Sequence, residues 1–402
     1  MDRLQTDVKN MITHVASLPK GATVEQLTGK VKSLTTAIQK DTVALPRRIK
    51  DIVQQAFLDM GWDVNRQRIV NVSKFTHEGL THSLAELLNN LQNWAPAVTP
   101  TDKELSDLSV ACDRLWELDA HRLVPDVDYV LNLQQGKRAY DQHDAAQLPL
   151  FTFVDEKALL RPTYASFIAL LDNYSANTGV SEVVTAEEKA ENAKFLNLVM
   201  DTAVMQYLHQ YLLASKKTKA TSRDAFIREL DDLWFGLYSR QAHNDSSGFE
   251  HVFVGEIKDG EITGFHNWIQ IYLEERKSLQ SNSDSFDYRG FIKPKRRALS
   301  TTQPRTLEQL VTIQFSWQGA LKTVSSSLIG TSPEFELALY TICFFSGLEE
   351  CDIRLGPYRA RITCYRWPAH PRKGDVVRVA TSFPSEAPLD EEEVRSGCCC
   401  CM

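Results

Sequence analysis

Two histidines flank an Asp-Gly dipeptide in GFEHVFVGEIKDGEITGFHNWIQIYL, residues 248–273. Asp-Gly between alternating apolar and polar residues is typical of a two-residue hairpin turn, which we predict at Asp259 and Gly260. A hairpin would bring His251 and His266 back toward each other, although they are 15 positions apart in the chain. Imidazole exchanges protons near neutral pH, so the pair is a candidate for acid–base chemistry.

The expected pairing sets the geometry of this pair. With the turn as its loop, Lys258 faces Glu261, and Phe253 faces His266. Because side chains alternate along a strand, His251 shares a face with Phe253 and therefore with His266. The two backbones would then lie roughly 7–8 Å apart on a diagonal of that face. A phosphate group fits between two imidazoles at such a spacing.

The second histidine precedes an expected helix. After Phe265 the alternation stops, and apolar residues recur at helical spacing at Trp268, Ile269, Tyr272 and Leu273. His266 would lie near the positive end of this helix, where the field disfavours imidazolium and holds the ring neutral, as a proton acceptor must be. Either histidine could instead simply pack or cap locally.

The composition describes the class of protein. The chain has 402 residues, 43% of them hydrophobic and 24% charged, as expected for a soluble globular protein of about two or three domains. We find no apolar run of transmembrane length and no signal segment after Met1, so we expect a cytoplasmic protein that is not secreted. The net charge of −7 argues against broad non-specific coating of nucleic acid.

Two local basic stretches remain as candidates for a groove, with solvated loops as the alternative reading. They are FIKPKRR and KKTK, which contribute Lys293, Lys295, Arg296, Arg297, Lys216, Lys217 and Lys219.

Cysteines occur in two settings. Cys112, Cys343, Cys351 and Cys364 are scattered without the CxxC spacing of a zinc site, which argues against a structural zinc. The final residues, Cys399 to Met402, have the outline of a prenylation box, with Cys398 available for acylation. The box has cysteines where aliphatic residues are usual, and an inert tail is the alternative. Lipidation would make the protein peripheral to membranes, with the acidic, flexible residues 387–402 as a tether.

The chain divides by pattern. Residues 1–95 are expected to be helical and to carry no chemistry, and the Pro/Thr-rich residues 95–102 form a linker. Residues 103–240 form a helical lobe, and residues 248–386 are richer in strands, with strands at 360–367 and 375–383 and a helix at 332–345. We therefore predict an α+β fold, in which a helical N-terminal part is followed by an antiparallel β-rich catalytic half.

Within the helical lobe, Thr185 and Glu188 have the spacing of a capping box. A following apolar stripe is expected to be core, as are Trp234 and Tyr238; the stripe consists of Leu196, Met200, Val204, Tyr207, Leu208 and Tyr211.

Several long segments in a fixed order resemble the EndoU (XendoU-type) endoribonucleases, which are distantly related to the uridylate-specific endoribonucleases of coronaviruses. The segments are LWELDAHRL, LPLFTFVDE, FIALLDNY, GFEHVFVGE, GFHNWIQIYL and SSLIGTSPEFELALYT. The resemblance covers residues 103–386, and the first hundred residues and the cysteine tail lie outside it.

This resemblance implies a reaction. Family members cut single-stranded RNA at uridines and leave a 2′,3′-cyclic phosphate, and many need manganese, so the implied cofactor is Mn²⁺. It also implies that His266 is the base that takes the 2′-OH proton and His251 the acid that protonates the leaving oxygen, although the two roles could be exchanged. The lysine of the family's W-x-x-x-x-K segment is Lys322, a cation for the charged phosphorane.

The same resemblance implies nucleotide-binding residues. Ser326 is at the position of a serine that reads the uracil base, and Thr381 and Phe383 match a Thr-x-Tyr pair that orients the nucleotide. Phenylalanine in place of tyrosine keeps a ring but lacks the hydroxyl. A second Thr-x-Tyr pair, Thr363 and Tyr365, lacks the proline that follows the family pair.

Two carboxylates, Glu250 and Glu256, match family positions and would lie on the face opposite His251 in the hairpin register, orienting the strand or binding metal indirectly. Manganese itself rests on the resemblance alone. The alternatives are a catalytically weak or inactive RNA-binding protein, a metallohydrolase with the two histidines as ligands, or a membrane-tethered adaptor. We expect an active endoribonuclease that binds single-stranded RNA as a monomer.

Overall fold

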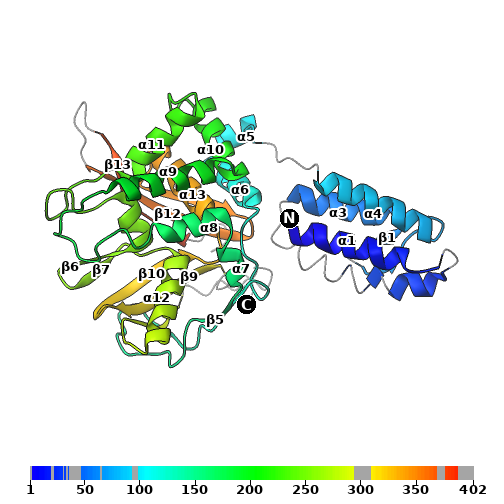
Figure 1. The fold of residues 1–402 in the computed structure, drawn as a ribbon, viewed down its shortest axis with the longest axis horizontal. Helices are drawn as coiled ribbons and strands as arrows, with labels where there is room; N and C mark the ends of the chain where they lie inside the picture. Colours follow the sequence, from blue (N-terminus) through cyan, green and yellow to red (C-terminus); the bar gives the residue numbers. More distant parts are fainter. Residues whose placement is uncertain are drawn as a thin grey trace, which may run out of the picture. The chain divides into compact units, whose positions relative to one another are not determined.

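The computed structural model describes residues 2–19, 22–29, 31–32, 35, 47–63, 66–92, 98–293, 309–368 and 376–387. The chain forms two compact units (Figure 1). One contains residues 1–97 with 117–124, and the other contains residues 98–116 with 125–402. Among the described residues, no helix combines the length and the apolarity needed to span a bilayer.

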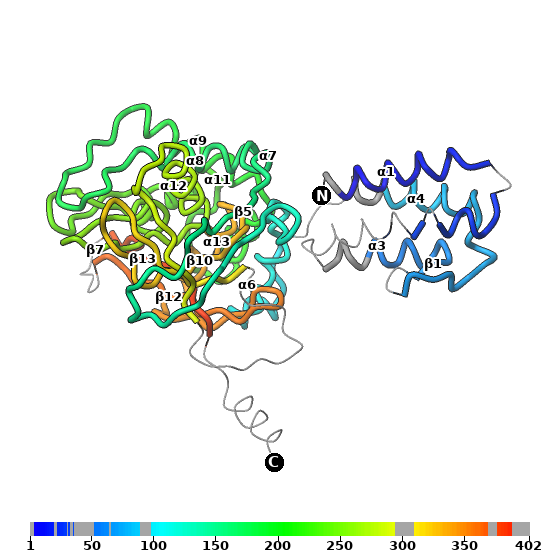
Figure 2. Tube along the Cα trace, turned by 90° about the horizontal axis from the view of Figure 1, so that it is seen from below, coloured from blue at the N-terminus to red at the C-terminus, as the bar shows by residue number. Residues whose placement is uncertain are grey.

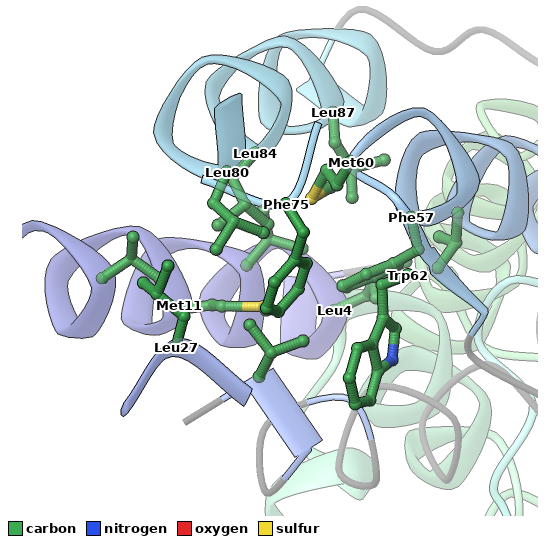
Figure 3. Packing of buried hydrophobic residues seen from close by; sticks show 14 residues of the cluster. Leu4, Met11, Leu27, Phe57, Met60, Trp62, Phe75, Leu80, Leu84 and Leu87 are labelled. Atoms are coloured by element: carbon green, nitrogen blue, oxygen red, sulfur yellow. The ribbon is translucent and has the colours of Figure 1, made fainter. Parts of the chain in front are cut away.

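The N-terminal unit is mainly helical, as expected. Its elements are α1 (Asp2–Ala16), α3 (Arg47–Asp59) and α4 (His77–Gln92), with residues 24–29 also helical and a short antiparallel pair, β1 (Trp62–Asp63) and β2 (Arg68–Ile69). Figure 3 shows apolar side chains from these helices meeting around Phe75, whose ring stacks on Trp62 at 5.6 Å. The 14 buried residues of this core all lie between Leu4 and Leu87, so the unit has a hydrophobic core of its own.

The first part of the second unit is a helical lobe. Its helices are α5 (Asp102–Ser106), α6 (Leu108–Leu118), α7 (Glu156–Leu159), α8 (Pro162–Ala169), α9 (Ala186–Met200), α10 (Ala203–Ala214) and α11 (Arg223–Phe235). The predicted capping box at Thr185 and Glu188 is present. The predicted apolar stripe is buried, as are Trp234 and Tyr238. The helix that carries the stripe is interrupted at Thr202, which caps α10.

The strands form two principal sheets and one small pair. The six-stranded sheet has the order β4-β8-β9-β10-β7-β6, the three-stranded sheet has the order β11-β12-β13, and β3 pairs with β5. The strands are β3 (Tyr129–Leu131), β4 (Gly136–Lys137), β5 (Phe151–Val154), β6 (Glu256–Lys258), β7 (Glu261–Thr263), β8 (Phe286–Ile292), β9 (Leu310–Trp317), β10 (Ala320–Leu328), β11 (Glu350–Leu355), β12 (Tyr358–Trp367) and β13 (Arg378–Glu386).

Most strand pairs are antiparallel, with parallel pairs at β10–β7 and β4–β8. The expected α+β fold is confirmed, as are the strands predicted near 360–367 and 375–383. In Figure 2, helices α8, α9 and α11 lie along one side of this unit and β12 and β13 along the other.

Two helices connect the sheets to the lobe. Helix α12 (Trp268–Ser281) packs against β8, and helix α13 (Pro333–Ser346) packs against β12 and β13. Both were predicted, and for α12 the prediction came from its apolar spacing. Their N-termini are joined, because Asn267, the N-cap of α12, donates from its side chain to Glu336 in the first turn of α13 at 3.1 Å. The backbone next to His266 is therefore fixed by a buried contact between two helices.

Candidate active site

The hairpin between the two histidines is shorter than predicted. Strands β6 and β7 pair with Lys258 opposite Glu261, as expected, and Asp259 and Gly260 form the turn with φ of 53° and 80°. The strand does not continue back to His251. Residues Glu250–Val254 form one turn of π-helix, η1, so the prediction that Phe253 faces His266 is wrong.

Burial explains this departure. All five residues of η1 are buried, so no polar side alternates with an apolar side as in a half-exposed strand. Phe249 and Phe253, four residues apart, both pack against Phe167 in the helical lobe, at 5.6 and 5.5 Å. Helical spacing brings the two rings close together on one side, whereas in a strand they would share a face but lie about 13 Å apart, too far for both to contact Phe167. Gly255, with φ of 95°, ends the turn.

Backbone hydrogen bonds nevertheless join the two histidine segments. The Phe265 amide donates to the His251 carbonyl at 3.1 Å, and the His266 amide donates to the Val252 carbonyl at 2.9 Å. Gly264 makes this approach possible, because a Cβ there would lie 1.6 Å from the His251 carbonyl oxygen. The two histidines therefore come together as predicted, but through a different backbone.

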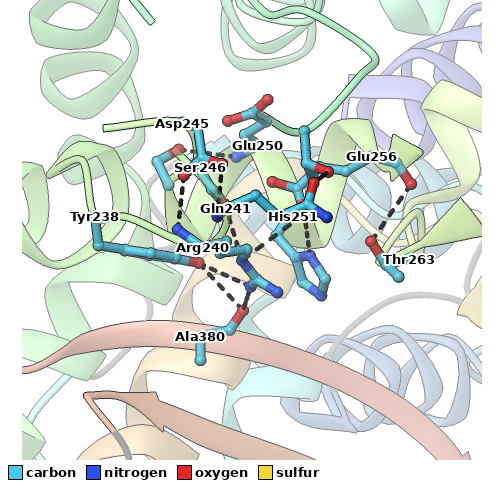
Figure 4. Close-up of polar contacts among 12 residues, drawn as sticks. Tyr238, Arg240, Gln241, Asp245, Ser246, Glu250, His251, Glu256, Thr263 and Ala380 are labelled. Atoms are coloured by element: carbon cyan, nitrogen blue, oxygen red, sulfur yellow. Dashed lines mark hydrogen bonds and ion pairs between the residues drawn. The ribbon is translucent and has the colours of Figure 1, made fainter. Parts of the chain in front are cut away.

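The His251 ring is held by a carboxylate. Its Nδ1 lies 2.6 Å from Glu256 Oε2, and both side chains are buried (Figure 4). The prediction that Glu256 lies on the face opposite His251 is wrong, because the π-turn directs the imidazole toward the start of β6. Since an ionised carboxylate only accepts, Nδ1 carries the proton and Nε2 is left for chemistry.

A partly buried arginine extends this network. Arg240 Nε lies 3.9 Å from Glu256 Oε2 and donates to Ser246 Oγ at 3.1 Å. Its Nη2 donates to the Tyr238 hydroxyl at 3.0 Å and to the Ala380 carbonyl at 2.5 Å (Figure 4). Arg240 thus links the partner of His251 to β13. No sequence pattern points to Arg240, because a single arginine in a loop carries no local signal.

These contacts set the protonation of the pair. Although burial opposes it, the hydrogen bond from His251 and the charge of Arg240 hold the pKa of Glu256 below its usual value. Burial lowers the pKa of His251, and the bond to Glu256 works against that effect. The carboxylate therefore stays charged and offsets part of the effect of burial, although the pKa of His251 remains below its usual value.

Glu250 is in a different state. Its side chain is buried, one carboxyl oxygen has no partner, and burial followed by repulsion from Glu256 raises its pKa to about 9. Glu250 is therefore a neutral carboxylic acid at pH 7.

His266 lies immediately before the N-cap of α12, at the predicted junction. Its Nδ1 lies 3.3 Å from the Ser326 carbonyl and 3.4 Å from Ser325 Oγ. A carbonyl only accepts, so Nδ1–H donates and Nε2 carries a lone pair. Burial, then the charges of Lys322 and His251, lower the pKa of His266 well below its usual value. The ring is neutral and is suited to accept a proton.

Lys322 is brought to the same place by β10. Leu321 pairs with Glu261 of β7, and Lys322 Nζ donates to the Ile262 carbonyl at 3.2 Å. Burial lowers the pKa of Lys322 to about 8. Its charge lowers the pKa of both His251 and His266, as expected for a cation close to both rings.

The predicted base-binding residues line the same site from two strands. Ser326 on β10 is buried, and its hydroxyl shares a hydrogen bond of 2.8 Å with Thr312 Oγ1. Phe383 on β13 stacks on the His266 ring at 4.8 Å with an angle of 22° between the planes. Thr381 is two residues before Phe383 and shares its face of the sheet.

Other predicted candidates lie elsewhere. Lys216, Lys217, Lys219 and Lys293 are exposed, while Lys295, Arg296, Arg297, Cys398 and Cys399 lie outside the described residues. The four scattered cysteines are buried free thiols.

The donor set for a metal is limited. In the part of the chain that the structure describes, no three His, Cys, Asp or Glu side chains are grouped so that they could hold an ion. Glu250 and Glu256 each have a buried oxygen without a partner, but they do not make a manganese cage by themselves.

Known proteins resemble this chain in sequence. A sequence model of the family described as "Endoribonuclease XendoU" matches residues 107–384. The chain is similar to poly(U)-specific endoribonuclease-A of Xenopus laevis, with 43% identity over 273 residues that cover 65% of this chain and 89% of the relative. It is also similar to uridylate-specific endoribonuclease B of Danio rerio, with 40% identity over 279 residues, covering 67% and 94%.

A solved structure is similar as well. "The structure of XendoU: a splicing independent snoRNA processing endoribonuclease" aligns with a TM-score of 0.59 and 39% identity, covering 72% of this chain and 99% of that one.

Proposed function

This chain belongs to the XendoU family of endoribonucleases, and we propose that it cleaves single-stranded RNA at uridines, leaving a 2′,3′-cyclic phosphate. The observation that carries the proposal is the pair of buried histidines beside Lys322, each with Nδ1 engaged and Nε2 left for a substrate. The names of curated relatives, which are uridylate- or poly(U)-specific endoribonucleases, support uridine as the target.

His266 acts as the general base. Its Nε2 takes the proton of the ribose 2′-OH as that oxygen attacks the adjacent phosphorus. A neutral ring is needed for this step, and its low pKa and its donation from Nδ1 to the Ser326 carbonyl both keep it neutral.

His251 acts as the general acid. Its Nε2 gives a proton to the 5′-oxygen as the P–O bond to that oxygen breaks, so the products are a 2′,3′-cyclic phosphate and a free 5′-hydroxyl. Glu256 stabilises the imidazolium through Nδ1–H, and a phosphate diester beside the ring adds a negative charge with the same effect. The different neighbours of the two histidines favour this order of roles over the reverse.

Lys322 stabilises the transition state. The phosphorane carries more negative charge than the diester, so a partly buried ammonium group beside it lowers the barrier. Ser326 and Thr381 supply hydroxyl groups for the uracil edge. Phe383 supplies a ring face whose position is fixed by its stack on His266.

Manganese dependence is a separate proposal that follows from the family resemblance. The described residues supply no cluster of three donors, so the ion would take part of its ligand set from RNA phosphates. No step of the reaction above requires it.

The test uses a short labelled RNA with one uridine and a matched RNA without uridine, each with and without manganese. We expect one cut, at the uridine, with a cyclic phosphate end, and a rate about 10²- to 10⁴-fold lower for His251→Ala. Binding without cleavage under both metal conditions would instead identify an RNA-binding protein on the same scaffold. A rate in His251→Ala equal to that of the native protein would contradict the proposed site.

A further inference from the structure

The three-stranded sheet presents a second aromatic residue beside the site. In the pairing of β12 with β13, Tyr365 lies opposite Thr381 and Thr363 lies opposite Phe383. Directly paired residues project from the same face of a sheet. Tyr365 therefore shares its face with Thr381 and Phe383.

That face is turned toward the catalytic histidines, because Phe383 stacks on His266. Tyr365 is diagonal to Phe383 in the sheet, a relation in which the Cα atoms are roughly 7–8 Å apart and aromatic side chains come within reach of each other. Successive bases of an extended RNA strand are separated by a step of similar size. A strand with its uracil at Phe383 and Thr381 would thus place a neighbouring base near Tyr365.

Packing does not account for the Tyr365 ring. It is 43% exposed, and among the described residues it has no ring contact and no hydrogen bond through its hydroxyl. Other tyrosines of this unit differ, since Tyr238 donates to the Ala380 carbonyl at 3.3 Å and Tyr288 donates to the Leu133 carbonyl at 2.8 Å. The Tyr365 ring is free to take a partner.

The strands hold Tyr365 in a fixed position. A β-bulge interrupts the pairing after Tyr365 and leaves Ala380 unpaired on β13. The Ala380 carbonyl accepts hydrogen bonds from Arg240 and Tyr238, which secures the bulge. Bulges next to active sites re-aim side chains, and this one determines where Thr381 and Tyr365 stand relative to each other.

We propose that Tyr365 binds the nucleotide adjacent to the cleaved uridine by stacking on its base. This subsite rests on the proposed function, since it takes the uridine position from that site. Because every base has a π-face, the subsite would accept any neighbouring base and would add affinity without sequence preference.

The test compares Tyr365→Ala and Tyr365→Phe with the native protein. Binding is measured by fluorescence anisotropy on a short RNA whose single uridine is 2′-deoxyuridine, which has no 2′-OH and is not cut. Three versions carry both neighbouring bases, an abasic residue on the 5′ side, or an abasic residue on the 3′ side. Tyr140→Ala is the matched control, because Tyr140 is an exposed tyrosine outside the three-stranded sheet.

We expect Tyr365→Ala to weaken binding of the fully based RNA about five- to a hundredfold, and Tyr365→Phe and Tyr140→Ala to bind like the native protein. One abasic RNA should bind the native protein and Tyr365→Ala equally, which would identify the stacked side. An effect of Tyr365→Ala that persists on both abasic RNAs would overturn the proposal. So would a loss in Tyr365→Phe as large as in Tyr365→Ala, because the hydroxyl would then be the contact.

Cleavage of the ordinary uridine RNA by the native protein is measured in parallel. Without cleavage, but with the expected pattern of binding, the proposed reaction fails and the stacking subsite stands. If the native protein cleaves the RNA but Tyr365→Ala binds RNA as tightly as the native protein does, the reaction stands and only the stacking subsite is overturned.

Discussion

The two histidines of the site differ only in their neighbours. His251 has Glu256 on its Nδ1, whereas His266 has a backbone carbonyl there. Burial and, to a smaller extent, the charge of Lys322 lower the pKa of both rings, but only His251 has a carboxylate that works against this. The same residue type is therefore biased toward donating a proton at one position and toward accepting one at the other.

The lowered pKa of Lys322 predicts how the reaction depends on pH. With a pKa of about 8, the ammonium group is charged below pH 8 and loses its charge as the pH rises through that value. Above about pH 8 the kcat/KM of the native protein should therefore fall more steeply than loss of the His251 proton alone would give. Lys322→Arg keeps its charge at higher pH, so its alkaline limb should move upward. Initial rates between pH 6 and 9.5, corrected for spontaneous RNA hydrolysis, would show this, and an identical limb in both proteins would exclude Lys322 as its source.

Glu250 makes a prediction about stability. Its pKa is about 9 in the folded protein and ordinary in the unfolded chain, so between those values only the unfolded state releases the proton. Stability should therefore decrease as the pH rises from about 5 to 9, and Glu250→Gln should lose part of that decrease. Thermal unfolding of both proteins across this range is the measurement. Glu261→Gln, at an exposed position, is the control and should follow the native protein.

Gly264 allows η1 and the segment that carries His266 to approach each other closely. Its φ is 63°, and an added Cβ would lie 1.6 Å from the His251 carbonyl oxygen, a backbone atom that cannot move aside cheaply. Gly264→Ala should therefore destabilise the protein by more than about 1 kcal/mol. Displacement of His251 by about 1 Å would lower kcat/KM about a hundredfold.

Gly260 provides the matched control for this change. Its φ is also positive, at 80°, but a Cβ there would meet nothing within 4 Å. Gly260→Ala should cost only the left-handed strain, about 1–2 kcal/mol, and should cleave RNA at nearly the native rate. Equal losses of activity in the two alanine variants would show that strain, rather than the contact with His251, is responsible.

Some of these helices, strands and turns can be predicted from the sequence, and others cannot. The Asp259–Gly260 turn follows from a turn dipeptide and helix α12 from apolar spacing, both of which are local signals, and helix α13 was also predicted from the sequence. The turn η1 does not follow from a local signal, because the apolar run VFV shows neither the period of a strand nor that of a helix. Its conformation is set by the aromatic core, against which Phe249 and Phe253 pack. The expected register of His251, and with it the orientation of Glu256, failed for that reason.

Local sequence patterns also cannot identify residues that act only through contacts with distant parts of the chain. Arg240 reaches Ala380, 140 positions along the chain, and Asn267 reaches Glu336, 69 positions along. The family resemblance brought His251, His266 and Lys322 to notice, but the contacts that orient their rings become visible only in the folded chain.

The N-terminal unit has a hydrophobic core that is separate from the catalytic unit. The N-terminal core is made only of residues between Leu4 and Leu87, and the residues that match the family begin at 107. Each unit should therefore fold without the other, because the apolar surface that stabilises it is buried within it.

Leu84→Ala in the full chain tests this independence. Leu84 is fully buried in the N-terminal core (Figure 3), and its truncation should cost that unit about 2–5 kcal/mol. The rate of RNA cleavage should stay at the native value, since no residue of the proposed site lies in this unit. Thermal unfolding followed by circular dichroism should show one transition that moves to lower temperature and one that does not. A loss of cleavage in parallel with the lower transition would mean that the N-terminal unit supports the catalytic one and would contradict the independence of their cores.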